Sequence, residues 1–115
     1  MAEPHDVPTA AELVEAVREW LERDVAANTT GRLRFHTRVA VNVLSMVERE
    51  MALGDDQAAA HRQRLDRLGV ADDAELAASI RSGRFDDRRD ELLAELRATV
   101  EDKLRVANPR YLDEN

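Results

Sequence analysis

The sequence predicts an all-α protein, folded as a single-domain bundle of about five helices, three long and two short. Three observations predict this class. Aromatic residues make up only 3% of the chain, so the core must consist of Leu, Val and Ala side chains. Leu, Ala, Glu and Arg, which favour helices, are abundant. The 4 glycines and 3 prolines lie at apparent element boundaries, and a length of 115 residues fits one domain spanning 1–115.

A capping box predicts where the first long helix begins. Thr9 occupies the N-cap position and Glu12 is placed to return a hydrogen bond to it, while residues 1–8 form a flexible N-terminal segment. Apolar residues then recur at helical spacing until the sequence Asn-Thr-Thr-Gly at 28–31 ends the helix. The apolar side of this helix contains Leu13, Val14, Val17, Trp20, Leu21 and Val25, and Asp24 lies on the same side.

The second long helix is expected over residues 32–53, with Gly54 as its C-terminal stop. Most of it falls between Asp24 and Glu48, a window without any acidic residue in a chain that has 24 of them and a net charge of −7. More than half of its circumference is apolar, which predicts that it lies at the centre of the bundle. The apolar arc contains Leu33, Phe35, His36, Val39, Ala40, Val43, Leu44, Met46, Val47 and Met51. The remaining polar strip contains Arg34, Arg38, Asn42, Ser45 and Arg49.

Three further helices are each expected to begin at an aspartate and to end at a glycine or before a proline. Their boundaries are Asp55-Asp56 to Gly69, Asp72 to Gly83, and Asp86-Asp87 to Asn108-Pro109. Because proline cannot continue a helix, residues 109–115 are expected to form a C-terminal tail.

The composition excludes several classes of protein and site. Without cysteine, the chain has no disulfide, no thiolate nucleophile and no Cys-ligated metal. No apolar stretch of about 18 residues is present and the N-terminus lacks a signal peptide, so we expect a cytoplasmic protein that does not enter the membrane. The net charge of −7 argues against nucleic-acid binding. No motif indicates a catalytic residue or a cofactor, and the lack of a Glu-x-x-His motif argues against a metal site built from Glu12, Glu15, Glu19 and Glu22.

His36 is the first candidate for a functional side chain, because it lies within the apolar arc of the second helix. A buried imidazole needs hydrogen-bond partners, and Asp24 is a candidate partner. The histidine is either structural, with its hydrogen bonds satisfied, or part of an Asp–His couple of the kind that performs acid–base catalysis. No Ser, Thr or Tyr is indicated as a nucleophile beside it.

The polar strip is the second candidate, since Arg34 and Arg38 have no acidic neighbour on their own helix before Glu48. The arginines either pair with glutamates of the first helix or face water, and such exposed pairs stabilise a fold by only about 0–1 kcal/mol each. The functional alternative is a site for an anion or an acidic partner, because the guanidinium group binds carboxylates and phosphates with two hydrogen bonds. The available glutamates are Glu15, Glu19 and Glu22.

The third candidate is a group of polar side chains near the C-terminus. Cations at this position complement the dipole of the final helix. Alternatively, the tail folds back onto the second helix and lines a pocket together with His36. The group consists of Lys103, Asn108, Arg110 and Tyr111.

The chain resembles an uncharacterised family of small helical bacterial proteins in three segments, which are PTAAELV at 8–14, GRLRFHTRVAVNVL at 31–44 and DKLRVANPRYL at 102–112. Members of this family tend to be encoded beside aminoglycoside-phosphotransferase-like kinases and acyl-CoA dehydrogenases. The resemblance implies an accessory protein in a lipid or acyl-CoA pathway, and it carries over no catalytic residue.

Two functions are compatible with these observations. The first is a non-catalytic interaction module that binds the neighbouring kinase or dehydrogenase through Arg34, Arg38 and the C-terminal tail. The alternative is a binding protein or enzyme for an acyl or phosphorylated small molecule, with a pocket around His36, Asn42 and Tyr111. A homodimer, in which a second copy covers part of the apolar arc, remains open.

Overall fold

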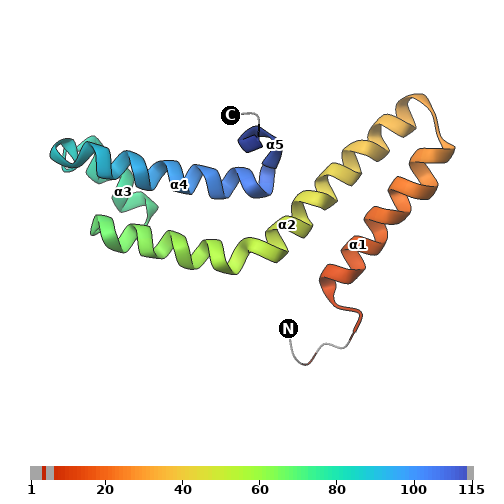
Figure 1. Ribbon diagram of the computed structural model, residues 1–115, viewed down its shortest axis with the longest axis horizontal. Coiled ribbons are helices and arrows are strands. Elements are labelled where there is room, and N and C mark those ends of the chain that lie inside the picture. The colour runs from red at the N-terminus through yellow and green to blue at the C-terminus, as the bar shows by residue number, and fades with distance from the viewer. Residues whose placement is uncertain (1–3, 5–6, 114–115) are drawn as a thin grey trace. The chain divides into compact units, whose positions relative to one another are not determined.

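The predicted all-α class is confirmed. A computed structural model describes residues 4 and 7–113, and among these it contains helices and no strand (Figure 1). Most of the predicted flexible segment 1–8 and the last two residues of the predicted tail therefore lie outside the described residues. The α-helices are α1 (Ala10–Trp20), α2 (Gly31–Leu68), α3 (Asp73–Arg81), α4 (Arg89–Ala107) and α5 (Pro109–Asp113).

The predicted helix count differs from the structure because the second and third predicted helices are one. Residues 31–68 form a continuous helix of 38 residues, with Gly54 in its interior. A glycine ends a helix when it adopts a left-handed conformation after the last turn. Gly69 does so, with a φ of +74°, whereas Gly54 is not among the glycines with positive φ. The five predicted helices thus correspond to α1–α4, and α5 is a single turn within the predicted tail.

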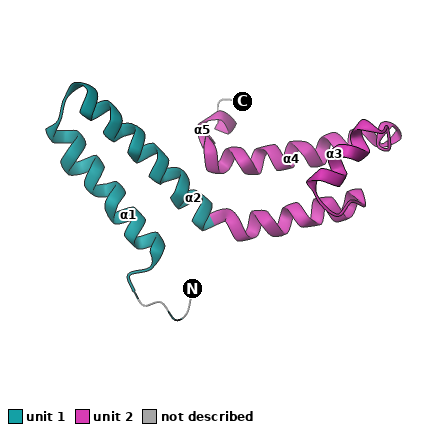
Figure 2. Ribbon diagram, turned by 180° about the vertical axis from the view of Figure 1, so that it is seen from behind, with its two compact units in different colours: residues 1–52 teal, residues 53–115 magenta. Residues whose placement is uncertain are grey.

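The chain divides into two compact units, which comprise residues 1–52 and 53–115 (Figure 2). Helix α2 contributes its N-terminal part to unit 1 and its C-terminal part to unit 2. Each unit has its own internal arrangement and is described separately.

Unit 1 is a hairpin of two helices, in which the N-terminal part of α2 runs antiparallel to α1 (Figure 2). The predicted capping box is present: the backbone N–H of Thr9 donates to Glu12 Oε1 at 3.0 Å, and the N–H of Glu12 donates to Thr9 Oγ1 at 3.2 Å. The N–H of Thr9 holds the pKa of the Glu12 carboxyl below its ordinary value, and the Thr9 hydroxyl adds to this effect. A π-helical turn (Leu21–Val25) and a 3-10 turn (Ala26–Asn28) lead to the break before α2.

Unit 2 contains the hydrophobic core. Its buried apolar side chains come from the end of α2, from α3, from the connections around α3 and from α4. Polar side chains tie α2 to α4 beside this core: Arg64 pairs with Asp102 at 2.7 Å, and Arg67 pairs with Glu95 at 2.9 Å. The core residues are Leu65, Leu68, Val70, Leu76, Phe85 and Leu92, with Leu96 packed against them.

The position of the core corrects the prediction that the apolar arc of residues 32–53 forms the centre of the bundle. Among the described residues of unit 1 only Thr37 is buried, and its hydroxyl donates to the carbonyl oxygen of Leu33 at 2.8 Å. The reason is geometric: a hairpin gives each helix one neighbour, whereas an arc this wide needs two or more. Most of the arc is therefore exposed.

Of the caps predicted for the last two long segments, the one at the start of α3 is present and the one at the start of α4 is not. Asp72 caps α3 as predicted, since its side chain accepts from the N–H of Glu75 at 2.8 Å. The prediction that Asp86 and Asp87 cap α4 was wrong, because both lie in a 3-10 turn and α4 begins after Arg88, without a side-chain cap. Backbone N–H groups of this turn already donate hydrogen bonds to backbone carbonyl oxygens. The N–H of Arg88, for example, donates to the carbonyl oxygen of Phe85 at 2.9 Å.

Substituting Gly54 by alanine is expected to raise the free energy of unfolding by roughly 0.5–1 kcal/mol, because alanine loses less backbone entropy in a helix. A Cβ at Gly54 would meet no atom within 4 Å. The matched control is Gly83→Ala, where φ is +85° and the Cβ would lie 2.9 Å from Asp86 Oδ2, so this change should destabilise. Urea unfolding followed by circular dichroism measures both, and a destabilised Gly54→Ala would contradict the helical assignment.

Candidate functional site

The eight predicted site residues are all exposed and fall in both units. Four of them share the N-terminal part of α2 in unit 1, and four lie at the end of α4 and in α5 in unit 2. The members of each group are close in sequence and therefore lie near one another. The pocket predicted around His36, Asn42 and Tyr111 would need residues from both groups, which belong to different units. The first group is Arg34, His36, Arg38 and Asn42, and the second is Lys103, Asn108, Arg110 and Tyr111.

His36 is exposed, which corrects the expectation that its imidazole is buried. Its ring stands edge-on to that of Phe35, with centroids 5.5 Å apart, and its Nε2 accepts a long hydrogen bond of 3.5 Å from Arg32 Nε. The structure shows no hydrogen bond between His36 and Asp24. The predicted Asp–His couple is therefore not assembled, and His36 lies on a flank of α2 rather than on the side that faces α1.

The arginines of α2 do not make the predicted pairs with the first helix. Arg34 and Arg38 are exposed and form no ion pair with any residue in the described part of the chain. The contact between the helices has the reverse polarity, since Arg18 of α1 pairs with Glu48 of α2, which raises the pKa of the Arg18 guanidinium. We call Arg34 and Arg38 together the arginine surface.

Two of the glutamates expected to face these arginines are engaged within the first helical segment instead. Glu22 accepts from Arg18 at 3.2 Å, and Glu19 lies 3.7 Å from Arg23. Both pairs join residues one turn apart. Such local pairs form without any tertiary contact.

Unit 1 exposes a large apolar surface. Phe35 is 63% exposed, Trp20 55% and Val43 52%, although large apolar side chains in a folded domain are usually covered. Three of the residues belong to α1 and seven to α2. We call this set the apolar face, and it comprises Leu13, Val17, Trp20, Leu33, Phe35, Val39, Val43, Met46, Val47 and Met51.

Most of the apolar face lies on a different flank of the hairpin from the arginine surface, and Phe35, Val39 and Met46 point outward from α2, on the side opposite α1. Thr37, Leu44 and Glu48 mark the side of α2 that faces α1. Successive residues of a helix are rotated by about 100°. Arg34 and Arg38 therefore lie on one flank of this side, and Val43 and Val47 lie on the other. The same rotation per residue places the exposed apolar residues of α1, which are Leu13, Val17 and Trp20, on the same flank of the hairpin as Val43 and Val47. The hairpin as a whole is thus amphipathic.

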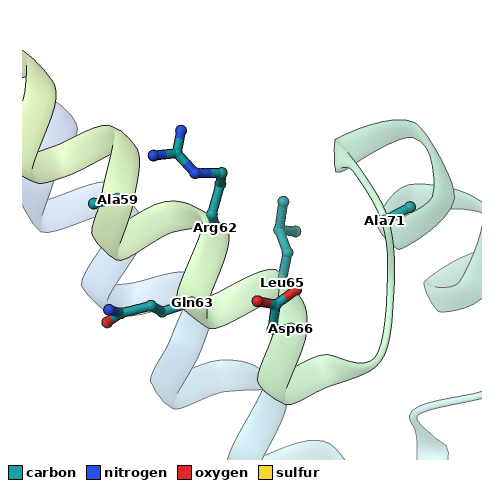
Figure 3. Close-up of a pocket in the computed structure, with 6 residues that line it drawn as sticks. All are labelled: Ala59, Arg62, Gln63, Leu65, Asp66 and Ala71. Atoms are coloured by element: carbon teal, nitrogen blue, oxygen red, sulfur yellow. The ribbon is translucent and has the colours of Figure 1, made fainter.

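Unit 2 contains an open pocket that the sequence did not indicate. It has a volume of about 380 Å³ and lies between the C-terminal part of α2 and the segment that leads to α3 (Figure 3). Arg62 and Leu65 project from α2 beside it, and Ala71 lies across from them (Figure 3). None of the eight predicted residues lines this pocket, and its lining residues are Ala59, Arg62, Gln63, Leu65, Asp66 and Ala71.

Unit 2 also contains the Asp–His contact that was expected elsewhere. His61 Nε2 lies 2.8 Å from Asp73 Oδ1, and the buried His61 Nδ1 has no hydrogen-bond partner in the described part of the chain. No hydroxyl side chain is hydrogen-bonded to this histidine there. The turn between α2 and α3 brings these two residues together, and no spacing rule in the sequence marks them as a pair.

The remaining tests for a site concern metals and membranes. Within residues 4 and 7–113, no group of three or more His, Asp or Glu side chains is arranged to hold a metal ion. None of the helices formed by these residues combines the length and the apolar character needed to cross a bilayer.

The chain matches no curated protein and no solved structure. Residues 27–111 match the model of a family described as a domain of unknown function, DUF6285. The matched segment runs from the end of the first helical segment into α5 and contains all eight predicted site residues. Because it covers more than half of the 115 residues, the protein belongs to the DUF6285 family.

Proposed function

We propose that the protein is a non-catalytic interaction module that docks an acidic surface of a partner protein through the arginine surface. The observation that supports this function is the state of Arg34 and Arg38, which are exposed, lie in a window without acidic residues and make no ion pair with the described chain. In a protein with a net charge of −7, two free arginines on one helix flank form an unusual local site.

The chemistry of arginine favours this role. A guanidinium group binds a carboxylate through two parallel hydrogen bonds and is weakly hydrated, so it is well suited to protein interfaces. Exposed charges stabilise a fold by at most about 1 kcal/mol, so these two residues have little structural purpose. Complementary charges across an interface speed association and exclude wrong partners.

The partner we propose is the phosphotransferase-like kinase or the acyl-CoA dehydrogenase that the resemblance associates with this bacterial family, in the cytoplasm. The exposed side chains of Lys103, Arg110 and Tyr111 offer a further set of contacts for such a partner. A small-molecule pocket around His36, Asn42 and Tyr111 has less support, because His36 and Asn42 are exposed on α2.

Reversing the charge of the arginine surface tests the proposal. Arg34→Glu/Arg38→Glu is expected to weaken binding to the partner by about tenfold or more, because attractive contacts become repulsive. Binding is measured by co-purification and then by calorimetry at two salt concentrations, and the affinity of the unaltered protein should fall as salt rises.

A matched control separates this effect from a general change in charge. Arg81→Glu/Arg97→Glu changes the net charge equally at two exposed positions of unit 2 and should bind as the unaltered protein does. Equal binding by the Arg34→Glu/Arg38→Glu variant, with unchanged helix content, would show that the arginine surface is not the interface.

A further inference from the structure

The two units differ in how much apolar surface they bury. The buried apolar side chains of the described chain, from Leu65 to Leu92, all lie in unit 2. Unit 1 buries Thr37 alone among its described residues, while its large side chains Trp20 and Phe35 are more than half exposed. Because the burial of apolar surface is the main source of stability in a folded protein, unit 1 has a much smaller source of stability than unit 2.

The polar contacts follow the same division. In unit 2, the pair of Arg64 with Asp102 at 2.7 Å joins α2 to α4, and its two side chains are 11% and 16% exposed. In unit 1, Arg18 and Glu48 join α1 to α2, but the Ser45 hydroxyl donates to a carbonyl oxygen four residues earlier on its own helix. A bond of this local kind does not hold one helix against another.

The boundary between the units lies inside α2, beside three consecutive residues that are poor helix formers. These residues are Gly54, Asp55 and Asp56. A Cβ at Gly54 would meet no atom within 4 Å, so nothing packs against that position. Asp55 and Asp56 are exposed and make no ion pair with any residue that the structure describes. The continuous helix therefore gains little from these side chains.

The same three residues are favourable where one helix ends and another begins. Glycine adopts the left-handed conformation that ends a helix at little cost, as Gly69 does at the end of α2. Aspartate accepts a hydrogen bond from an N–H of the first turn, as Asp72 does for α3. With Asp55 as an N-cap, Asp56 would take the first helical position, where a negative charge is stabilising. A break here thus recovers part of the free energy that it costs.

We infer that unit 1 opens as a separate cooperative unit while unit 2 stays folded, and that α2 then breaks at Gly54 with Asp55 as the N-cap of the remaining helix. Segments with few buried apolar contacts open at free energies well below that of global unfolding. The remaining helix, residues 55–68, keeps its side chains in the core of unit 2. The inference goes beyond the proposed function and concerns the chain without any partner.

Amide hydrogen exchange of the full chain, resolved by NMR at low protein concentration, tests the opening. After correction for intrinsic rates, amides of residues 38–47 are expected to exchange about a hundredfold faster than amides of residues 65–68. The first strongly protected amide after the break should be that of residue 59. The reason is that the N–H groups of an N-cap and of the three residues after it, here 55–58, have no acceptor within their helix.

Substitution of both aspartates tests the position of the break. Asp55→Ala/Asp56→Ala should slow exchange in residues 38–47 about fivefold, because alanine favours the continuous helix and cannot cap a broken one. Asp55→Asn/Asp56→Asn should stay within about twofold of the unaltered protein, since asparagine is an equally good cap. The matched control is Asp66→Ala, an exposed position of the same helix within unit 2, which should leave exchange in residues 38–47 unchanged.

Three results would overturn the inference. The first is equal protection of residues 38–47 and 65–68, which would show that the two units unfold together. The second is a protection profile that rises elsewhere in α2 than at residues 54–60, because the opening would then not end at Gly54. The third is unchanged exchange in Asp55→Ala/Asp56→Ala, which would exclude Asp55 as the cap of the opened state.

Discussion

Replacing Phe85 by alanine is expected to lower the free energy of unfolding by about 3–5 kcal/mol. The side chain is only 2% exposed and lies in the core of unit 2. Its loss leaves a cavity and removes the ring against which two guanidinium groups rest, since Arg84 and Arg88 have their Cζ atoms 5.5 and 5.3 Å from its centre. A loss of this size is a large part of the stability of a small protein.

The effect should extend beyond the cavity, because the same two arginines hold the end of α2. Arg84 Nη2 donates to the carbonyl oxygen of Gly69 at 3.0 Å, and Arg88 Nη2 donates to that of Arg67 at 3.3 Å. Without the ring, both side chains gain freedom and these hydrogen bonds weaken. Urea unfolding followed by circular dichroism measures the loss.

The chain contains its own control, since its second phenylalanine has the opposite environment. Phe35 is 63% exposed, so Phe35→Ala should change the stability of the monomer by less than about 1 kcal/mol. The comparison is made at low protein concentration, where self-association does not contribute. Equal losses for the two variants would contradict the location of the core in unit 2.

Removing the carboxylate of Asp102 is expected to have the second largest effect, a loss of roughly 1–3 kcal/mol for Asp102→Ala. The Asp102 carboxylate accepts from Arg64 at 2.7 Å and from Arg105 at 2.9 Å. The side chain of Arg64 is 11% exposed, so it would be left with one hydrogen bond of 3.4 Å to Thr99 and little access to water. A buried cation without its partner costs more than the pair contributes.

A surface ion pair on the same helix provides the comparison. Glu91 pairs with Arg88 one turn away at 2.8 Å, and both side chains are more than a third exposed. Thermal unfolding should therefore show a clear decrease in melting temperature for Asp102→Ala and a much smaller one for Glu91→Ala. Similar decreases would mean that burial does not strengthen the contact between α2 and α4.

Local signals in the sequence predicted the boundaries that depend on local bonds. The Thr9–Glu12 capping box, the Asp72 cap and the stops at Gly69 and Asn108 all hold, because each involves residues a few positions apart. Gly54 was mistaken for a stop because its conformation, not its identity, decides whether a helix ends. Asp86 and Asp87 were mistaken for caps because a 3-10 turn precedes α4.

The sequence indicated the surroundings of the candidate residues only in part. The arginine surface was identified from the window without acidic residues, and the structure leaves both arginines unpaired within the described chain. The environment of His36 was not predictable, because periodicity shows that a side chain shares an apolar arc but not what lies against that arc. The contact of His61 with Asp73 and the pocket beside Arg62 depend on the turn after α2, which no spacing rule reports.

The sequence by itself determined that the protein is all-α, where most helices begin and end, and which side of each helix is apolar. These properties follow from backbone propensity, capping and a period of about 3.6 residues, all of which act within a few turns. Only the tertiary structure decided which apolar side is buried, because burial depends on how many neighbours a helix has. That is why the core formed around Leu68 and Phe85, while the more apolar stretch around Val43 remained exposed.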